Sequence, residues 1–306
     1  MIQLPPLIVE RRHAVGIVRH QLRPGQQATV LAVSSIHISP RIQQQLWELD
    51  NGERIVVTSR SGVAIPEGVD GVLLDRDGRY VWGAHRLIEH FHMEAGQTGW
   101  NEKARRIAAI WNGRLAFRAE VRQPDGSVSA GQEGLRPPQL GALHAIGAHW
   151  SLDLRPATVV MPTGTGKTET MLATLAAYSR SPILVVVPWD LLRKQTAGKF
   201  LTFGLLRSLG VLPHEVPNPI VGIMTKRPTS AADLGMFNEC NVIVATIHTV
   251  GVGIDAQLLA NIAERCQALV LDEAHHVAAT NWSRLKSAFH SVPILQFTAT
   301  PFRRDG

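Results

Sequence analysis

Six short apolar runs recur through the second half of the chain. They are ATVVM (157–161), PILVVV (182–187), PIVGI (219–223), NVIVAT (241–246), ALVL (268–271) and PILQF (293–297). Helix-compatible stretches such as KTETMLATLAAYSR separate them. Apolar strands that do not alternate with polar residues, separated by helices, are typical of a parallel sheet covered on both faces. Ligands of such sheets bind beyond the carboxyl ends of the strands, so the residues after each run are the candidates for a site.

The first run is followed by PTGTGKTET, which has the pattern of a phosphate-binding loop. Its glycines let backbone N–H groups turn toward a phosphate, and the helix that follows adds its N-terminal dipole. Lys167 can reach the β- and γ-phosphates of ATP, and the Thr168 hydroxyl can bind Mg²⁺. The general pattern has Gly where this chain has Met161. The loop residues expected around the nucleotide are Thr163, Gly164, Thr165 and Gly166.

The fifth run is followed by DEAHH, which places two carboxylates at a strand end. Asp272 is expected to hold Mg²⁺, and Glu273 to act as a base or to orient the attacking water. Adjacent carboxylates can also be a solvated turn. Their place in the same sheet as a phosphate-binding loop favours the nucleotide site.

MPTGTGKT, LDEAHH and FTATPFR, in this order, resemble motifs I, II and III of superfamily 2 helicases and translocases, in particular the restriction-enzyme-like and DEAH-labelled members. The resemblance covers roughly residues 135–306. It implies a RecA-like ATP-binding domain that acts on DNA or RNA. It also implies that His275 couples the nucleotide site to the strand-binding face, and that Thr298 and Thr300 link the two sites.

The resemblance assigns roles to further residues. LRPPQ resembles an adenine-recognition segment, so Gln139 would bind adenine with Arg136 beside it; a helix start after two prolines is the alternative reading. VVPWDLLRKQ and VATIHTV resemble motifs Ia and Ib. The residues that these motifs would place near a nucleic-acid strand are Pro188, Trp189, Gln195 and Thr246.

The N-terminal part of the chain has a different pattern. Short β-favouring runs alternate with Gly, Asp and Pro turns from residue 14 to 82, and a helical pattern covers 101–113. QPDGSVSAGQEGLRPP then has the composition of a linker or exposed loop. We therefore expect a smaller β-rich α+β accessory domain of unknown role at 1–130, followed by the RecA-like domain at 131–306.

Composition narrows the function classes further. The formal net charge of +6 and the pI of about 9.8 favour an acidic partner such as nucleic acid. The 45% of hydrophobic residues is ordinary for a globular protein, and no apolar run has the roughly 18 residues of a membrane span. Two cysteines fit a reducing compartment, so a cytoplasmic protein is expected.

The sequence thus predicts the ATP-binding part of an ATP-dependent helicase or translocase that requires Mg²⁺. The alternative is an ATP-gated binding or scaffolding subunit of a defence or restriction complex that has no turnover alone. We expect the second RecA-like domain to be absent from these 306 residues and to belong to a longer protein or a partner subunit. Hydrolysis by the isolated chain is then expected to be weak.

Overall fold

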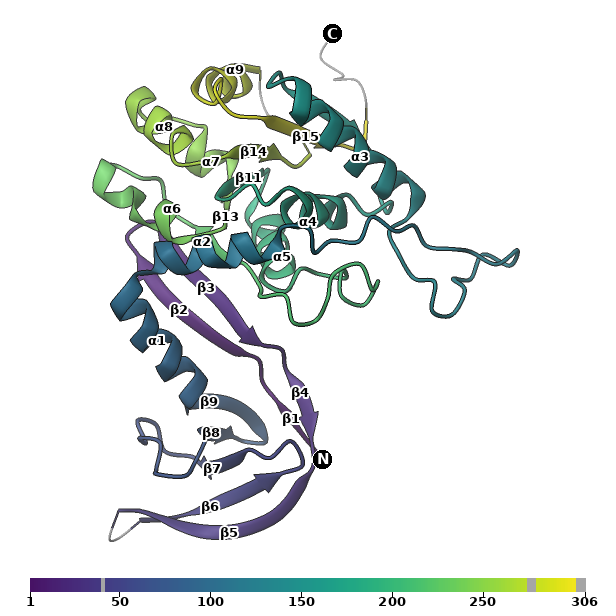
Figure 1. Ribbon diagram of the computed structural model, residues 1–306. Helices are drawn as coiled ribbons and strands as arrows, with labels where there is room; N and C mark the ends of the chain where they lie inside the picture. Colours follow the sequence, from purple (N-terminus) through teal and green to yellow (C-terminus); the bar gives the residue numbers. More distant parts are fainter. Residues whose placement is uncertain (40–41, 274–278, 301–306) are drawn as a thin grey trace. The chain divides into compact units, whose positions relative to one another are not determined.

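The computed structural model describes residues 1–39, 42–273 and 279–300 and divides into two compact units (Figure 1). The smaller unit comprises Met1–Val9 and Gln21–Gly99, and the larger unit comprises Glu10–His20 and Trp100–Gly306. The chain therefore leaves the smaller unit at residue 99, whereas the linker composition indicated a boundary near residue 130. In the described part of the chain, no helix combines the length and apolar character that crossing a membrane requires.

The smaller unit is β-rich, as predicted. A two-stranded antiparallel sheet pairs β1 with β4, and a five-stranded sheet has the order β5-β6-β7-β8-β9. All neighbours in the second sheet are antiparallel except β7 and β8. The bounds are β1 Ile2–Leu4, β4 Gln26–Ala28, β5 Val30–Ser39, β6 Ile42–Leu49, β7 Arg54–Thr58, β8 Gly71–Arg76, β9 Arg79–His85 and α1 Arg86–Thr98.

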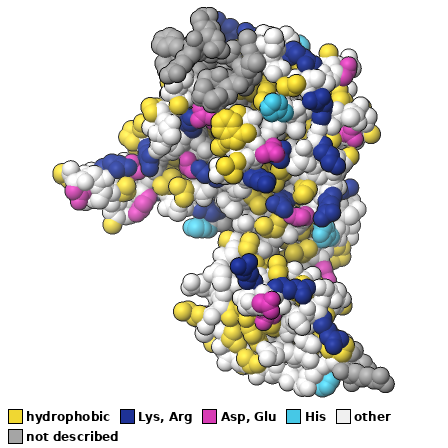
Figure 2. All heavy atoms as spheres, turned by 180° about the vertical axis from the view of Figure 1, so that it is seen from behind, with side chains coloured by type: hydrophobic (Ala, Val, Ile, Leu, Met, Phe, Trp, Pro, Cys, Tyr) yellow, Lys and Arg dark blue, Asp and Glu magenta, His cyan; other side chains and the backbone are white. Residues whose placement is uncertain are grey.

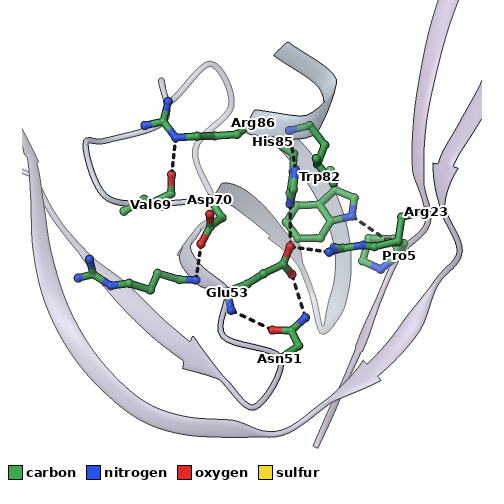
Figure 3. A network of polar contacts seen from close by, with 11 residues as sticks. Pro5, Arg23, Asn51, Glu53, Val69, Asp70, Trp82, His85 and Arg86 are labelled. Carbon is green, nitrogen blue, oxygen red and sulfur yellow. Dashed lines mark hydrogen bonds and ion pairs between the residues drawn. The ribbon is translucent and has the colours of Figure 1, made fainter. Parts of the chain in front are cut away.

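A half-buried polar network centred on Glu53 lies in this unit (Figure 3). The Glu53 carboxylate accepts hydrogen bonds from Arg23 Nη1 at 2.5 Å, from Asn51 Nδ2 at 3.1 Å and from His85 Nε2 at 3.2 Å. His85 Nδ1 also accepts the backbone N–H of Leu87 at the start of α1, which leaves the ring proton on Nε2. Because partial burial removes water from the carboxylate, these charge-assisted contacts stabilise its ionised form.

The larger unit is built on an eight-stranded sheet of order β10-β15-β14-β11-β13-β12-β3-β2. The first six strands are parallel. Each of them coincides, to within one residue, with one of the six apolar runs of the sequence. β3 then pairs with β12 in antiparallel fashion. The bounds are β2 Leu7–His13, β3 Gly16–Arg23, β10 Ala157–Val160, β11 Ile183–Val187, β12 Ile220–Met224, β13 Val242–Thr246, β14 Ala268–Leu271 and β15 Ile294–Thr298.

Helices cover both faces of this sheet (Figure 1). The chain crosses the sheet in one direction from β10 to β12 and returns from β12 to β15. Because parallel crossovers are right-handed, the helices of the two directions lie on opposite faces. The bounds are α2 Trp100–Trp111, α3 Pro137–Leu152, α4 Lys167–Tyr178, α5 Asp190–Thr202, η1 Ala231–Leu234, α6 Gly235–Glu239, α7 Ile247–Val250, α8 Ala256–Ala263 and α9 Ala279–Ala288.

Burial along the strands follows their place in the sheet. Every residue of the central strands β11, β13 and β14 is buried, whereas exposed and half-buried residues alternate along the edge strand β10. The apolar runs are therefore continuous where both faces are covered. This arrangement confirms the predicted RecA-like α/β fold and brings the carboxyl ends of the parallel strands to one edge.

Candidate ATP-binding site

The predicted phosphate-binding loop connects the edge strand β10 to helix α4. Gly164 and Gly166 have φ values of +84° and +92°, a conformation that favours glycine. Gly166 caps α4, and Lys167 and Thr168 are the first two residues of that helix. The loop therefore directs the first N–H groups of α4 toward the edge of the sheet where the other strands end.

Met161 stands where the usual pattern has glycine, and its surroundings show why a side chain is tolerated there. Its backbone N–H donates to Thr298 O at 2.9 Å, which continues the pairing of β10 with β15. Its side chain is buried, and Thr170 Oγ1 donates to the sulfur at 3.6 Å. A side chain is therefore accommodated here because it points into the core.

The carboxylates of the DEAHH segment lie beside the loop. Lys167 Nζ forms an ion pair with Glu273 Oε1. This contact joins the segment that follows β10 to the segment that follows β14. Asp272 is 6% exposed, and its N–H donates to Val186 O at 2.9 Å. Burial and the adjacent Glu273 charge raise the pKa of Asp272 to about 6, against the lowering effect of Lys167. A cation next to Asp272 would stabilise its ionised form.

Arg136 and Gln139, at the start of α3, contact the backbone of the phosphate-binding loop. Arg136 Nη1 donates to Gly164 O at 2.7 Å, and Gln139 Nε2 donates to Gly166 O at 3.2 Å. Gln139 Oε1 accepts the backbone N–H of Arg136 at 2.8 Å, and its side chain is buried. Both residues therefore hold the loop, and the predicted contact with adenine stays a prediction.

The residues predicted to form motif III also lie next to the loop. Thr298 is buried at the end of β15, and its Oγ1 donates to Thr300 O at 2.9 Å. Thr300 N–H donates back to Thr298 Oγ1 at 3.2 Å. The end of β15 is connected to the start of the loop by the hydrogen bond from Met161 N–H to Thr298 O. His275 lies outside the described residues.

The predicted nucleic-acid residues follow β11 and β13 at the same edge of the sheet. Pro188 is buried, whereas Trp189 at the start of α5 is 47% exposed and Gln195 is exposed on that helix. Thr246 is buried at the start of α7, where its N–H donates to Thr249 Oγ1 at 3.1 Å. Of the four, Trp189 and Gln195 thus present the more accessible side chains, and the roles of all four stay predictions.

A second ion pair, which was not predicted, joins the first turn of α4 to α5. Lys199 Nζ on α5 contacts Glu169 Oε1 on α4 at 3.0 Å, and Glu169 is buried. The positive charge of Lys199 also acts against the rise in the pKa of Asp272, to a smaller extent than Lys167 does. The sequence shows only that Glu169 is a charged residue two positions after Lys167. Its partner could not be predicted, because the pairing depends on where α5 lies.

One family model matches the part of the chain that carries the motifs. Residues 132–303 match the family described as type III restriction enzyme, res subunit. No curated protein matches the chain. Similar solved structures include the UvsW helicase from bacteriophage T4, at 15% identity over 67% of this chain with a TM-score of 0.38. The DUF1998 helicase MrfA is 15% identical over 56% of this chain with a TM-score of 0.39. The chain covers 60% of the UvsW structure and 27% of the MrfA structure.

Proposed function

The chain belongs to the type III restriction enzyme res subunit family within the superfamily 2 helicases and translocases, and we propose that it is the ATP-binding part of a motor that moves along nucleic acid. Residues 131–306 serve as its first RecA-like domain and residues 1–130 as an accessory region. The observation that supports this function best is the contact of Lys167 with Glu273 beside the buried Asp272.

In this proposal Lys167 exchanges one anionic partner for another. The β- and γ-phosphates of ATP carry more negative charge than one carboxylate, so they attract the Lys167 ammonium away from Glu273. Glu273 is then available to orient the water that attacks the γ-phosphate. Nucleotide binding and the release of the catalytic carboxylate are thereby linked through one side chain.

The residues present also fit a magnesium ion. Mg²⁺ prefers oxygen ligands and is usually held by one or two carboxylates together with substrate phosphates and water. Asp272 and Thr168 supply a carboxylate and a hydroxyl at the loop, and the described residues contain no cluster of three or more His, Cys, Asp or Glu that would hold a metal alone. When bound with ATP, the ion neutralises charge on the phosphates.

Nucleic acid would lie along the segments that follow β11 and β13. Trp189 and Gln195 are accessible there, and Thr246 lies at the start of α7. Thr298 and Thr300 would transmit the state of the nucleotide, because hydroxyl groups can change hydrogen-bond partners without a change of charge. The contact of Thr298 with Met161 supports this role.

Complete hydrolysis would also require an arginine on the opposite side of the nucleotide. We propose that a second RecA-like domain, in the same polypeptide or in a partner, supplies it. Such an arginine contributes about 10³–10⁵ in rate in related phosphoryl-transfer enzymes. Residues 1–306 alone are then expected to bind ATP and to hydrolyse it slowly, and the added domain or partner to raise the rate by at least ~10³.

The experiment compares Glu273→Gln with Glu264→Gln, an exposed carboxylate at the end of α8. ATP binding is measured by calorimetry and hydrolysis by phosphate release, with the second domain or partner present. Glu273→Gln should keep ATP binding and lose the rate gain, whereas Glu264→Gln should keep both. Full hydrolysis by Glu273→Gln would contradict the motor. A chain that binds ATP but never hydrolyses it with the second domain present would favour the ATP-gated scaffold.

A further inference from the structure

The hairpin formed by β2 and β3 carries basic residues to the edge of the sheet at which the ATP site lies. β3 is antiparallel to β12, with Gly16 opposite Met224 and His20 opposite Ile220. The turn at residues 14–15 therefore lies at the carboxyl end of β12. Since β12 is parallel to β13 and β11, this is also the edge that holds Thr246 and Trp189.

The tip of the hairpin is held firmly in place. Val15 O accepts the backbone N–H groups of Thr225 at 2.8 Å and Lys226 at 3.0 Å. Gly16 approaches β12 so closely that a Cβ would lie 2.1 Å from Ile223 O. The residues of the tip and those after β12 therefore form one surface with a fixed spacing.

Arg227 connects this surface to the segment that follows β13. Its Nη2 donates to His248 O and its Nη1 to Gly253 O, each at 3.4 Å. His248 is exposed and follows Thr246 by two residues. A continuous border thus leads from the expected nucleic-acid segment at Thr246, through Arg227 and Lys226, to the hairpin.

This border has an excess of positive charge. On the hairpin, Glu10 pairs with Arg19 at 2.5 Å, and Arg11 and His13 both contact Glu239 on α6. Arg12 and Lys226 are exposed and form no ion pair within the described part of the chain. Figure 2 shows Lys and Arg side chains interspersed with Asp and Glu on the face it presents. Arg12 and Lys226 are therefore two cations of this border that have no carboxylate partner within the described residues.

We propose that this border, defined by Arg12, Lys226 and Arg227, extends the path of single-stranded nucleic acid beyond motif Ib and binds its phosphates. The inference rests on the proposed function, because the strand would reach the border from the segments after β11 and β13. Long basic side chains at fixed spacing suit a backbone that carries one charge per nucleotide, and they carry no sequence information. The N-terminal hairpin would thus be a part of the track itself.

The experiment measures binding of a fluorescein-labelled 20-nucleotide oligo(dT) to residues 1–306 by anisotropy, between 50 and 300 mM NaCl. The variants are Arg12→Ala, Lys226→Ala and Arg12→Lys. Arg105→Ala is the matched control, because Arg105 is an exposed arginine on α2 that lines a cavity with residues preceding β11 and β14, at the opposite edge of the sheet. Thermal unfolding of each variant verifies that it folds.

Each alanine variant should lower the slope of log affinity against log salt by about 0.7, the value for one contact to a single strand. Extrapolated to 1 M salt, this corresponds to a loss of about eightfold in affinity at 50 mM salt. Arg12→Lys and Arg105→Ala should keep the slope of the unsubstituted chain. Alanine variants that bind like the unsubstituted chain would overturn this inference and leave the proposed function intact. Absence of salt-dependent binding by the unsubstituted chain would overturn both.

Discussion

Two glycines of the phosphate-binding loop allow a matched test of how the loop is held. Gly164 and Gly166 have similar φ values of +84° and +92°, so alanine at either position meets the same kind of backbone strain. That strain costs about 1–2 kcal/mol. Their surroundings differ, however. A Cβ at Gly164 meets nothing within 4 Å, whereas a Cβ at Gly166 would lie 2.0 Å from Gln139 Nε2.

The clash gives Gly166→Ala an additional cost. Gln139 would have to move and would lose its hydrogen bonds to Gly166 O and Arg136 N–H, each contributing about 0.5–1.5 kcal/mol. Gln139 is 4% exposed, so water does not easily replace these partners. Gly166→Ala should therefore lower the free energy of unfolding by about 1–3 kcal/mol more than Gly164→Ala.

Urea unfolding followed by circular dichroism measures both variants, together with Gln139→Ala and the double variant Gln139→Ala/Gly166→Ala. Because the double variant has no clash, its loss should be smaller than the sum of the two single losses by about 1–3 kcal/mol. Equal losses for Gly164→Ala and Gly166→Ala, or strict additivity in the double variant, would refute the role of Gln139 in holding the loop.

Substitutions at Lys167, Glu53 and Asn241 test three further contacts. Lys167→Ala should abolish saturable ATP binding in calorimetry because it removes the cation expected on the phosphates, and unchanged binding would show the site assignment to be wrong. Burial raises the pKa of Glu53, but hydrogen bonds from His85 and Arg23 outweigh it and lower the pKa from 4.5 to about 2. The stability from Glu53 should therefore be complete above pH 4.5 and decline as the pH falls toward 2, and Glu53→Gln should remove this part of the pH dependence in thermal unfolding. Asn241→Ala should cost about 2–4 kcal/mol in urea unfolding, since this fully buried side chain makes three hydrogen bonds.

Much of the larger unit could be predicted from its sequence. The parallel strands were visible because burial on both faces requires unbroken apolar runs. The meeting of Lys167 with Glu273 could also be expected, since both follow strands whose carboxyl ends share one edge. The sequence thus identified the strand ends, and the sheet order decided which of them are neighbours.

The hairpin of β2 and β3 could not be predicted in the same way. Residues 16–20 pair with residues 220–224, and no local pattern signals a partner so distant in the chain. The short β-favouring runs of this region fit a small separate β domain equally well, and such a domain was the prediction. The contacts of Arg136 and Gln139 with the loop were hidden for a similar reason, because they depend on where α3 lies.

The path of the chain between its two units limits how this protein can be divided, by an experimenter or by evolution. The chain passes between the units after residues 9, 20 and 99, so neither unit is a single uninterrupted segment. A gene fusion that begins at residue 100 would omit β2 and β3 and leave the edge of β12 unpaired, and exposed strand edges promote aggregation. Recombination that replaces the smaller unit without that loss must preserve residues 10–20 and join the new segment on both sides of them. An exchange of the smaller unit that keeps the eight-stranded sheet intact therefore needs two junctions in the N-terminal hairpin as well as one at residue 99.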